Sequence, residues 1–221
     1  MNIGQLIAER GKPFYSFEFF PPKDPDQWPD FFKMAERLAP LEPLFTSVTY
    51  GAGGSSQDAT LEIVSHLKKE FQFETMAHLT CVGATQDYIT QYLQRLRDNG
   101  VDNVLALRGD IPFGWTGTNG DLHYATELVK FVRKEFGDKF TIAVAGSPEG
   151  HIQCRSLEAD IAFLKQKQDN GADYIISQLC WDMDQFRYWM DAIRAATGLQ
   201  TTREEGTAMT NRYLRIGTFK R

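Results

Sequence analysis

Glu18 is the residue best placed to do chemistry, a lone acid within Tyr15-Ser-Phe-Glu-Phe-Phe-Pro-Pro22. A carboxyl group among phenylalanines has two plausible environments. If it faces outward, it is solvated and has no special role. If it faces the mouth of a barrel, burial raises its pKa and makes it a usable proton donor near neutral pH. Spacing favours neither environment, but Pro21 and Pro22 place Glu18 at the end of a strand, which favours the second.

A second acid, Asp110, ends the segment Asn103-Val-Leu-Ala-Leu-Arg-Gly-Asp110. Gly109 permits a close approach of the backbone to another molecule, and the turn exposes Arg108 and Asp110 where a strand ends. A surface turn with a weak salt bridge explains the same residues at least as well. Taken alone, the segment leaves both alternatives open.

Two further features are suggestive but weak. Thr49-Tyr-Gly-Ala-Gly-Gly-Ser-Ser56 is a glycine-rich loop before a helix, whose N–H groups could bind phosphate. It lacks the lysine of a P-loop, and its glycine spacing is not that of a dinucleotide-binding turn. His78 and His151, the latter in Ser147-Pro-Glu-Gly-His151, are single histidines of a kind that is more often structural.

Other site chemistries find no support in the sequence. No Ser/His/Asp or Cys/His arrangement points to nucleophilic catalysis. The cysteines, Cys81, Cys154 and Cys180, are far apart and form no CxxC motif, and no histidine stands at metal-ligand spacing. We therefore expect no metal site and no disulfide framework, and a reducing compartment.

Short apolar segments alternate with helical patterns along the chain. The segments span 14–20, 45–50, 73–79, 103–107, 140–145 and 173–178, and their first residues lie 28 to 37 positions apart. This is the length of one strand with its crossover helix. Helical spacing of apolar residues is clear over 57–70, 86–98, 157–169 and 184–196. Gly100 and Gly171 follow two of these helices as expected C-caps.

Strands that alternate with helices predict an α/β fold with a parallel sheet. Polar residues gather where these strands end: Glu18, Thr49, Tyr50, His78, Arg108, Asp110, His151 and Gln178. In a (β/α)₈ barrel that end of the sheet carries the active site. A doubly wound nucleotide fold would place a glycine-rich turn after the first strand, where this chain has Pro21 and Pro22. We predict a (β/α)₈ TIM-barrel type fold.

The barrel is expected to be incomplete, with about six βα units recognisable. Two more units need roughly 60 residues at about 30 each, more than the chain has after Gln178. Residues 197–221 are polar and weakly patterned, with only Tyr213–Ile216 hinting at a strand. We therefore divide the chain into a barrel domain at 1–196 and an atypical C-terminal tail at 197–221.

Composition limits the class of protein. The formal net charge is −5, the pI is about 5.4, and there is no Lys/Arg block, so a nucleic-acid partner is not expected. No stretch approaches the ~18 apolar residues of a membrane span. Residues 1–10 resemble a short amphipathic helix more than a signal peptide. A soluble cytoplasmic domain is expected.

Six motifs, in order from about residue 13 to residue 195, closely resemble the 5,10-methylenetetrahydrofolate reductase family. They are Ser16-Phe-Glu-Phe-Phe-Pro-Pro-Lys23, Ser47-Val-Thr-Tyr-Gly-Ala-Gly-Gly54, Ala77-His-Leu-Thr-Cys81, Leu105-Ala-Leu-Arg-Gly-Asp-Ile-Pro112, Ser147-Pro-Glu-Gly-His151 and Gly171-Ala-Asp-Tyr-Ile-Ile-Ser-Gln178. The resemblance implies a barrel that holds FAD and passes electrons from NAD(P)H to methylenetetrahydrofolate, giving 5-methyltetrahydrofolate.

The resemblance also implies roles for particular residues. Glu18 matches the general acid, and Asp110 matches an aspartate near flavin and pterin whose charge can stabilise an iminium cation. Gln178 matches a glutamine at the folate-binding face. The positions that match flavin contacts are Thr49, Tyr50, Ala52, His78, Arg108, Gly109, Asp110, Tyr124, Ala125, His151, Asp160 and Lys167.

The chain departs from the family pattern at three places. Ser147 stands where relatives often have a tyrosine beside the flavin, and Phe163 where some have a polar contact. The seventh and eighth strands of the family are not recognisable. Two alternatives to a complete enzyme follow: a non-catalytic flavin-binding or interaction subunit that needs a partner, and a defective fragment. A homo-oligomer or a partner subunit is expected, and the choice between NADH and NADPH stays open.

Overall fold

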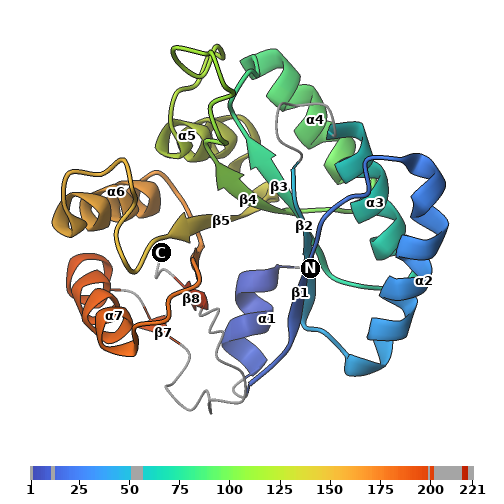
Figure 1. Cartoon of the computed structure of the whole chain (residues 1–221), viewed down its shortest axis with the longest axis horizontal. Helices are drawn as coiled ribbons and strands as arrows, with labels where there is room; N and C mark the ends of the chain where they lie inside the picture. Colours follow the sequence, from blue (N-terminus) through green and yellow to red (C-terminus); the bar gives the residue numbers. More distant parts are fainter. Residues whose placement is uncertain (1, 11–12, 51–56, 199, 202–215, 219–221) are drawn as a thin grey trace.

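The structure is a computed structural model that describes residues 2–10, 13–50, 57–198, 200–201 and 216–218. Six strands form a curled parallel sheet, with helices packed on its outer face (Figure 1). The strands are β1 (Ser16–Phe19), β2 (Phe45–Val48), β3 (Thr75–Thr80), β4 (Asn103–Leu107), β5 (Thr141–Gly146) and β6 (Tyr174–Ser177). Each strand pairs in parallel with the one before it. The order never reverses, so the sheet is of barrel type and not doubly wound.

The helices follow the strands as the sequence predicts. They are α2 (Trp28–Leu38), α3 (Gln57–Glu70), α4 (Gln86–Asp98), α5 (Ala125–Phe136), α6 (Leu157–Asp169) and α7 (Met183–Thr197). The predicted helices at 57–70, 86–98 and 157–169 are confirmed in full, and that at 184–196 within one residue at each end. Gly100 and Gly171 have the positive φ expected of C-caps, at +76° and +106°. The sequence analysis missed α2 and α5.

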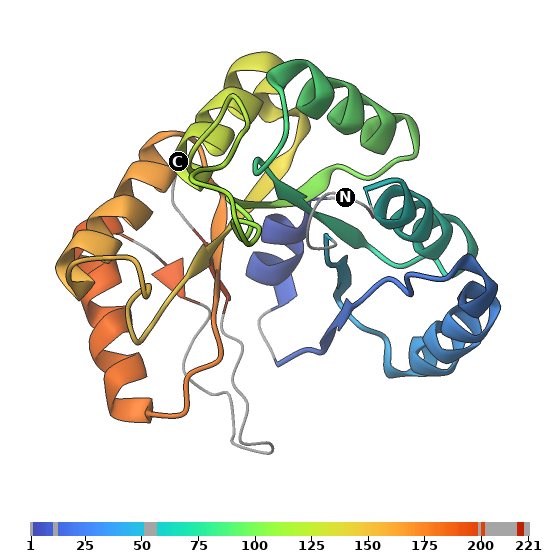
Figure 2. The same ribbon diagram turned by 45° about the horizontal axis from the view of Figure 1, so that its top comes forward.

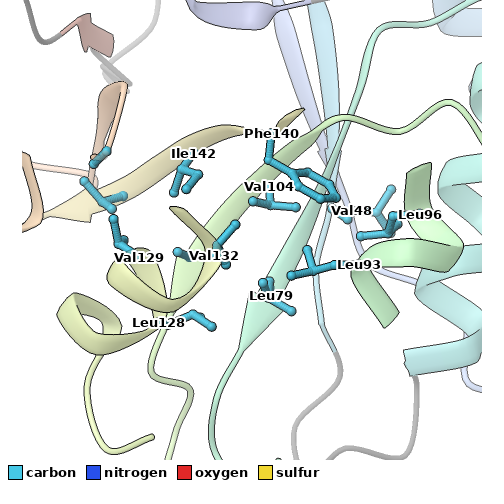
Figure 3. Packing of buried hydrophobic residues seen from close by; sticks show 14 of the residues in the cluster. Val48, Leu79, Leu93, Leu96, Val104, Leu128, Val129, Val132, Phe140 and Ile142 are labelled. Atoms are coloured by element: carbon cyan, nitrogen blue, oxygen red, sulfur yellow. The ribbon is translucent and has the colours of Figure 1, made fainter. Parts of the chain in front are cut away.

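The main core lies between the outer face of the sheet and these helices. Strand residues such as Val48, Val104 and Ile142 are fully buried there against helix residues such as Leu93 and Val132 (Figure 3). Because side chains alternate along a strand, these outward-facing positions leave the intervening residues for the concave face. The helix layer thus fixes which residues face the interior of the curve.

The N-terminal helix α1 (Ile3–Arg10) confirms the amphipathic helix expected at the start of the chain. It lies inside the curve of the sheet (Figure 1 and Figure 2). Ile3 and Ile7 are fully buried there against a second cluster that includes Phe45 and Met76. The Ile3 N–H also donates to Asn103 Oδ1 at 3.0 Å. This helix fills the interior near the amino ends of the strands.

The sheet does not close into a complete barrel within the described residues. After β6 comes a short antiparallel pair, β7 (Gln200–Thr201) and β8 (Ile216–Thr218), with β8 next to β6. β1 pairs only with β2 among the described strands. The expected incomplete barrel with six βα units is therefore confirmed. Of the predicted strand at 213–216, residues 213–215 lie outside the described residues.

Candidate active site

Three neighbouring strands bring polar side chains together near the carboxyl end of the sheet. Glu18 is the third residue of β1 and pairs in register with Ser47 of β2. The Ser47 hydroxyl donates to Glu18 Oε2 at 3.5 Å, and His78 Nε2 on β3 lies 3.3 Å from the same oxygen. His78 follows Met76 by two residues and so shares its concave face. Glu18 therefore faces the interior, the second of the two environments considered for it.

The pKa of Glu18 differs from the sequence-based expectation. Its close contact with His78 is the largest influence and lowers the pKa below 4.5, more than burial raises it; the Ser47 hydroxyl lowers it further. The Glu18 side chain is 50% exposed, so the loss of solvation is too small to dominate. The expectation of a raised pKa was wrong, and Glu18 is ionised at neutral pH.

Two buried polar atoms on the same face of β3 have no hydrogen-bond partner among the described residues. They are His78 Nε2 and Thr80 Oγ1. The His78 ring is within ion-pair distance of Glu18, but the two groups are not aligned as a regular hydrogen bond. Buried polar atoms are nearly always paired in native proteins, so these two are suited to a bound molecule.

The residues after β2 lie beside this group. The Thr49 N–H donates to Phe19 O at 2.9 Å, which joins the ends of β1 and β2. Tyr50 is partly buried edge-on against Tyr92, at 6.1 Å between ring centroids, and burial is the main reason why its pKa is raised far above 10. Its hydroxyl thus stays protonated. Ala52 and the rest of the glycine-rich loop, 51–56, lie outside the described residues.

The backbone after β4 adopts a conformation that only glycine tolerates well at position 109. Gly109 has φ +88°, and a Cβ there would lie 2.5 Å from Val82 Cγ1. The Arg108 guanidinium donates to Gly109 O at 3.0 Å and to Gln153 Oε1 at 2.5 Å. Asp110 is exposed. The turn therefore presents a cation and an anion at the end of β4, as the sequence predicted.

A second polar group lies beyond β5. Asp160, in the first turn of α6, accepts from the His151 N–H at 3.1 Å. Lys167 lies farther along the same helix, and its Nζ donates to Ala145 O at 3.1 Å. Burial lowers the pKa of Lys167, and the nearby Asp160 carboxylate partly restores it. Arg108 reaches the loop after β5 through Gln153, whose N–H donates to His151 Nδ1, and Lys167 supplies a second basic side chain on α6.

The remaining predicted residues stand at element ends. Gln178 follows β6 and is exposed, and its N–H donates to Gly146 O at 2.7 Å. Tyr124 is an exposed N-cap residue of α5, and Ala125 begins that helix. The structure thus places the predicted site residues that it describes in or after successive strands. Among those from β1 to β3, Glu18 and His78 are the pair whose side chains are in direct contact.

Comparison with known proteins identifies the family. The family profile described as "Methylenetetrahydrofolate reductase" matches residues 2–202. The chain belongs to the methylenetetrahydrofolate reductase family.

Individual relatives agree with this assignment. "Methylenetetrahydrofolate reductase (NADH) 1" of Arabidopsis thaliana is 41% identical over 200 residues, which cover 85% of this chain and 34% of the relative. "5,10-methylenetetrahydrofolate reductase" of Pectobacterium carotovorum is 35% identical over 218 residues, 98% of this chain and 71% of the relative. The chain spans about a third of the length of the plant, yeast and fission-yeast relatives it matches.

A solved structure agrees on the fold alone. The crystal structure of 2,3-dimethylmalate lyase, a member of the PEP mutase/isocitrate lyase superfamily, has a TM-score of 0.53 at 9% identity. The match covers 86% of this chain and 67% of that chain. It is consistent with a curled half-barrel of TIM-barrel type.

Two features of this reductase-family site were not found from the sequence. Ser47 could have been found by alternation, since it lies on the same strand two residues after Phe45, whose side chain faces the interior. The contact of Arg108 with Gln153 has no local signal, because the two residues are 45 positions apart.

A loop at this end of the sheet was also missed. The β4–α5 loop is fastened to the start of α4: the Gly83 N–H donates to Thr118 O at 2.7 Å, and the Gln86 N–H to Asp121 Oδ2 at 2.8 Å. A Cβ on Gly120 would lie 2.6 Å from Ala84 O. The absence of a side chain at this position thus lets two loops at the carboxyl end of the sheet pack closely.

The described part of the chain lacks two further kinds of feature. No group of three or more His, Cys, Asp or Glu side chains is arranged to hold a metal ion there. No helix in the same residues is long and apolar enough to cross a membrane.

Proposed function

We propose that this chain reduces 5,10-methylenetetrahydrofolate to 5-methyltetrahydrofolate, with FAD as cofactor and NAD(P)H as electron donor. The main support for this proposal is the Glu18 carboxylate, which lies on the concave face in contact with His78 in a chain of the reductase family. The name of the Arabidopsis relative, an NADH form, supports a nicotinamide nucleotide as donor.

The residues fit a cofactor with phosphate and ring groups. Lys167 and Arg108 supply cations beyond β5 and β4, suited to phosphate oxygens. His78 Nε2 and Thr80 Oγ1 are buried polar atoms that a bound molecule can satisfy. The exposed Tyr124 ring offers a stacking surface at the same end of the sheet. We assign flavin contacts to twelve residues in all. They are Thr49, Tyr50, Ala52, His78, Arg108, Gly109, Asp110, Tyr124, Ala125, His151, Asp160 and Lys167.

Bound FAD would supply hydride transfer between the nicotinamide and the folate, and the residues of the chain supply the proton and the charge. Glu18 gives a proton to the bridging nitrogen of the folate. As the N–H bond forms, the bond from that nitrogen to the bridging carbon breaks and leaves an iminium cation. Because the contact with His78 favours the ionised form of Glu18, the carboxyl group must gain a proton before it can act as the acid.

Two exposed residues complete the proposed site. The Asp110 carboxylate, after β4, carries the negative charge that stabilises the iminium cation. The Gln178 side chain, after β6, binds the folate through its amide. Both stand at carboxyl ends of strands, where barrel enzymes bind their substrates.

The setting of the enzyme belongs to the same proposal. We assign the reductase domain to residues 1–196 and an atypical C-terminal tail to 197–221, of which β8 extends the sheet beside β6. A cytoplasmic location is supported by Cys81, Cys154 and Cys180, which are all free thiols. A homo-oligomer or a partner subunit is supported by the sheet edge at β1, which pairs only with β2 among the described strands.

Flavin spectroscopy tests the proposed function. The purified chain is loaded with FAD, bleached anaerobically with NADH or NADPH, and then mixed with methylenetetrahydrofolate. We expect bleaching by a nicotinamide nucleotide and recovery of the flavin absorbance with the folate. Bleaching without recovery would refute the reductase activity and leave a flavin-binding subunit. Failure to bind FAD would refute the cofactor assignment.

A further inference from the structure

The contact between Glu18 and His78 joins two strands that are not neighbours in the sheet. Glu18 stands on β1 and His78 on β3, with Ser47 of β2 between them. His78 Nε2 lies 3.3 Å from Glu18 Oε2. The side chain of His78 is only 8% exposed, whereas that of Glu18 is 50% exposed. A buried imidazole is thus aimed at a carboxylate that opens to the mouth of the sheet.

The His78 ring has few other ways to satisfy Nε2. Among the described residues this atom has no regular hydrogen bond. The groups that face Glu18 are the His78 ring on β3 and the Ser47 hydroxyl on β2. On β1, its neighbours Phe17 and Phe19 carry no charge. Imidazole is the side chain that ordinarily gains and loses a proton between pH 5 and 8.

We propose that His78 is the positioning residue of Glu18, which holds the carboxylate on the concave face and stores the proton that Glu18 delivers. This role rests on the proposed function. It goes beyond flavin contact, because it acts through Glu18.

Solvent decides where the stored proton resides. The contact with His78 lowers the pKa of Glu18 and so favours its ionised form; on our proposal, the shared proton then sits on His78 Nε2. When bound molecules exclude water, the neutral pair is favoured, because charge separation is costly in a low dielectric. The Nε2–H bond then breaks and an O–H bond forms on Glu18 Oε2. After Glu18 passes this proton to the substrate, solvent protonates the pair again, so each turnover consumes one proton.

The pairing can be tested in the ligand-free chain, without any enzyme activity. The chain is labelled with ¹³C at the glutamate carboxyl carbons and titrated by NMR, and the Glu18 signal is assigned by its loss in Glu18→Gln. We expect the Glu18 midpoint to lie below 4.5, where the His78 contact holds its pKa. In His78→Gln, which can still donate a hydrogen bond but cannot carry the charge, the midpoint should move upward.

The matched control is His66→Gln. His66 lies on α3, stacked on Phe32 at 3.8 Å between ring centroids, and does not face Glu18. This substitution should leave the Glu18 midpoint in place. An unchanged midpoint in His78→Gln would overturn the pairing. If His78→Gln does not fold, the wild-type titration still decides: a midpoint at or above 4.5 overturns the pairing.

The storage of the proton is tested by the pH profile of folate reduction. At neutral pH, His78→Gln should lower kcat by roughly 10²-fold, the order expected when general acid catalysis is lost, while KM changes little. The kcat of His78→Gln should fall ten-fold for each unit of pH increase, beginning at acidic pH. Over the same pH range the kcat of the wild type should stay constant. Parallel profiles would overturn the storage role. An inactive wild type would refute the proposed function, while the NMR titration would still decide the pairing.

Discussion

Two contacts between an acidic and a basic side chain lie at opposite ends of the sheet. At the amino end, Arg133 of α5 meets Asp173, which precedes β6, with Nη2 2.5 Å from Oδ2. Both side chains are largely buried. Arg133 also donates to the carbonyl groups of Gly171, Gly137 and Phe140, and Asp173 Oδ2 accepts from the Ile142 N–H at 2.7 Å. The polar atoms of this pair are thus hydrogen-bonded to other groups of the protein.

The Glu18–His78 contact at the carboxyl end has the opposite character. Its acid is half exposed, its imidazole lacks a regular hydrogen bond among the described residues, and its geometry is loose. A saturated pair holds elements together and leaves nothing for a ligand, whereas an unsaturated pair can respond to one. The difference agrees with the division in barrels between a stabilising amino end and a catalytic carboxyl end.

The largest expected effect is on stability, at the saturated pair. Arg133→Met leaves Asp173 buried without its cation, so we expect a loss of about 3–5 kcal/mol in the free energy of unfolding. Urea denaturation followed by circular dichroism measures it. The control is Arg187→Met, whose pair with Asp184 is exposed and should contribute less than about 1 kcal/mol. Equal effects of the two substitutions would contradict the contrast between the ends.

The next effect is on catalysis, at the unsaturated pair. Glu18→Gln removes the proton donor, so folate reduction should slow by roughly 10²–10⁴-fold, while flavin reduction by NAD(P)H continues. Stopped-flow absorbance separates the two half-reactions. Glu149→Gln, an exposed acid in the loop after β5, should leave both rates unchanged. If Glu18→Gln slowed both half-reactions equally, Glu18 would not be the proton donor.

Local patterns in the sequence predicted most of this frame. Alternation of apolar residues and the prolines after Glu18 placed that acid at a strand end, and the helices at 57–70, 86–98 and 157–169 agree in full. Helical spacing and C-cap glycines depend on neighbours a few positions away, so they can be read directly. The same holds for the polar residues that end successive strands.

Contacts between residues far apart in the chain leave no local pattern in the sequence. The pKa of Glu18 depends on His78, and the two meet only because the strand register aligns β1, β2 and β3. The phenylalanines around Glu18 suggested that burial would raise its pKa. Because the Glu18 side chain is half exposed at the open edge of the sheet, the effect of burial on its pKa is small. The antiparallel β8 beside β6 was not predicted either, since strand direction is set by the fold and not by local pattern.

A smaller effect is expected where a loop is fastened at the catalytic end. Asp121 Oδ2 accepts from the Gln86 N–H in the first turn of α4. Asp121→Ala should cost about 1 kcal/mol, as for a lost helix cap, measured by urea denaturation. Asp191→Ala, which loses only an exposed pair with Arg194, should change stability by less than about 0.5 kcal/mol. If Asp121→Ala lowered the free energy of unfolding as much as Arg133→Met, the carboxyl end of the sheet would depend on its polar contacts as strongly as the amino end.

The smallest effect is the pH dependence that Glu18 adds to stability. Its folded pKa is held below 4.5 by His78, while its unfolded pKa has the ordinary value. The stabilisation is therefore complete above about pH 4.5 and is lost as pH falls through the folded pKa. The difference in unfolding free energy between wild type and Glu18→Gln should shrink on acidification below this point, as measured by urea denaturation at pH 7 and at several values between 3 and 5. Because Glu18 is half exposed, the change is small, but its sign is decisive. A stabilisation of wild type that grew on acidification would mean that burial outweighs His78, and the two ends of the sheet would then differ less than their contacts indicate.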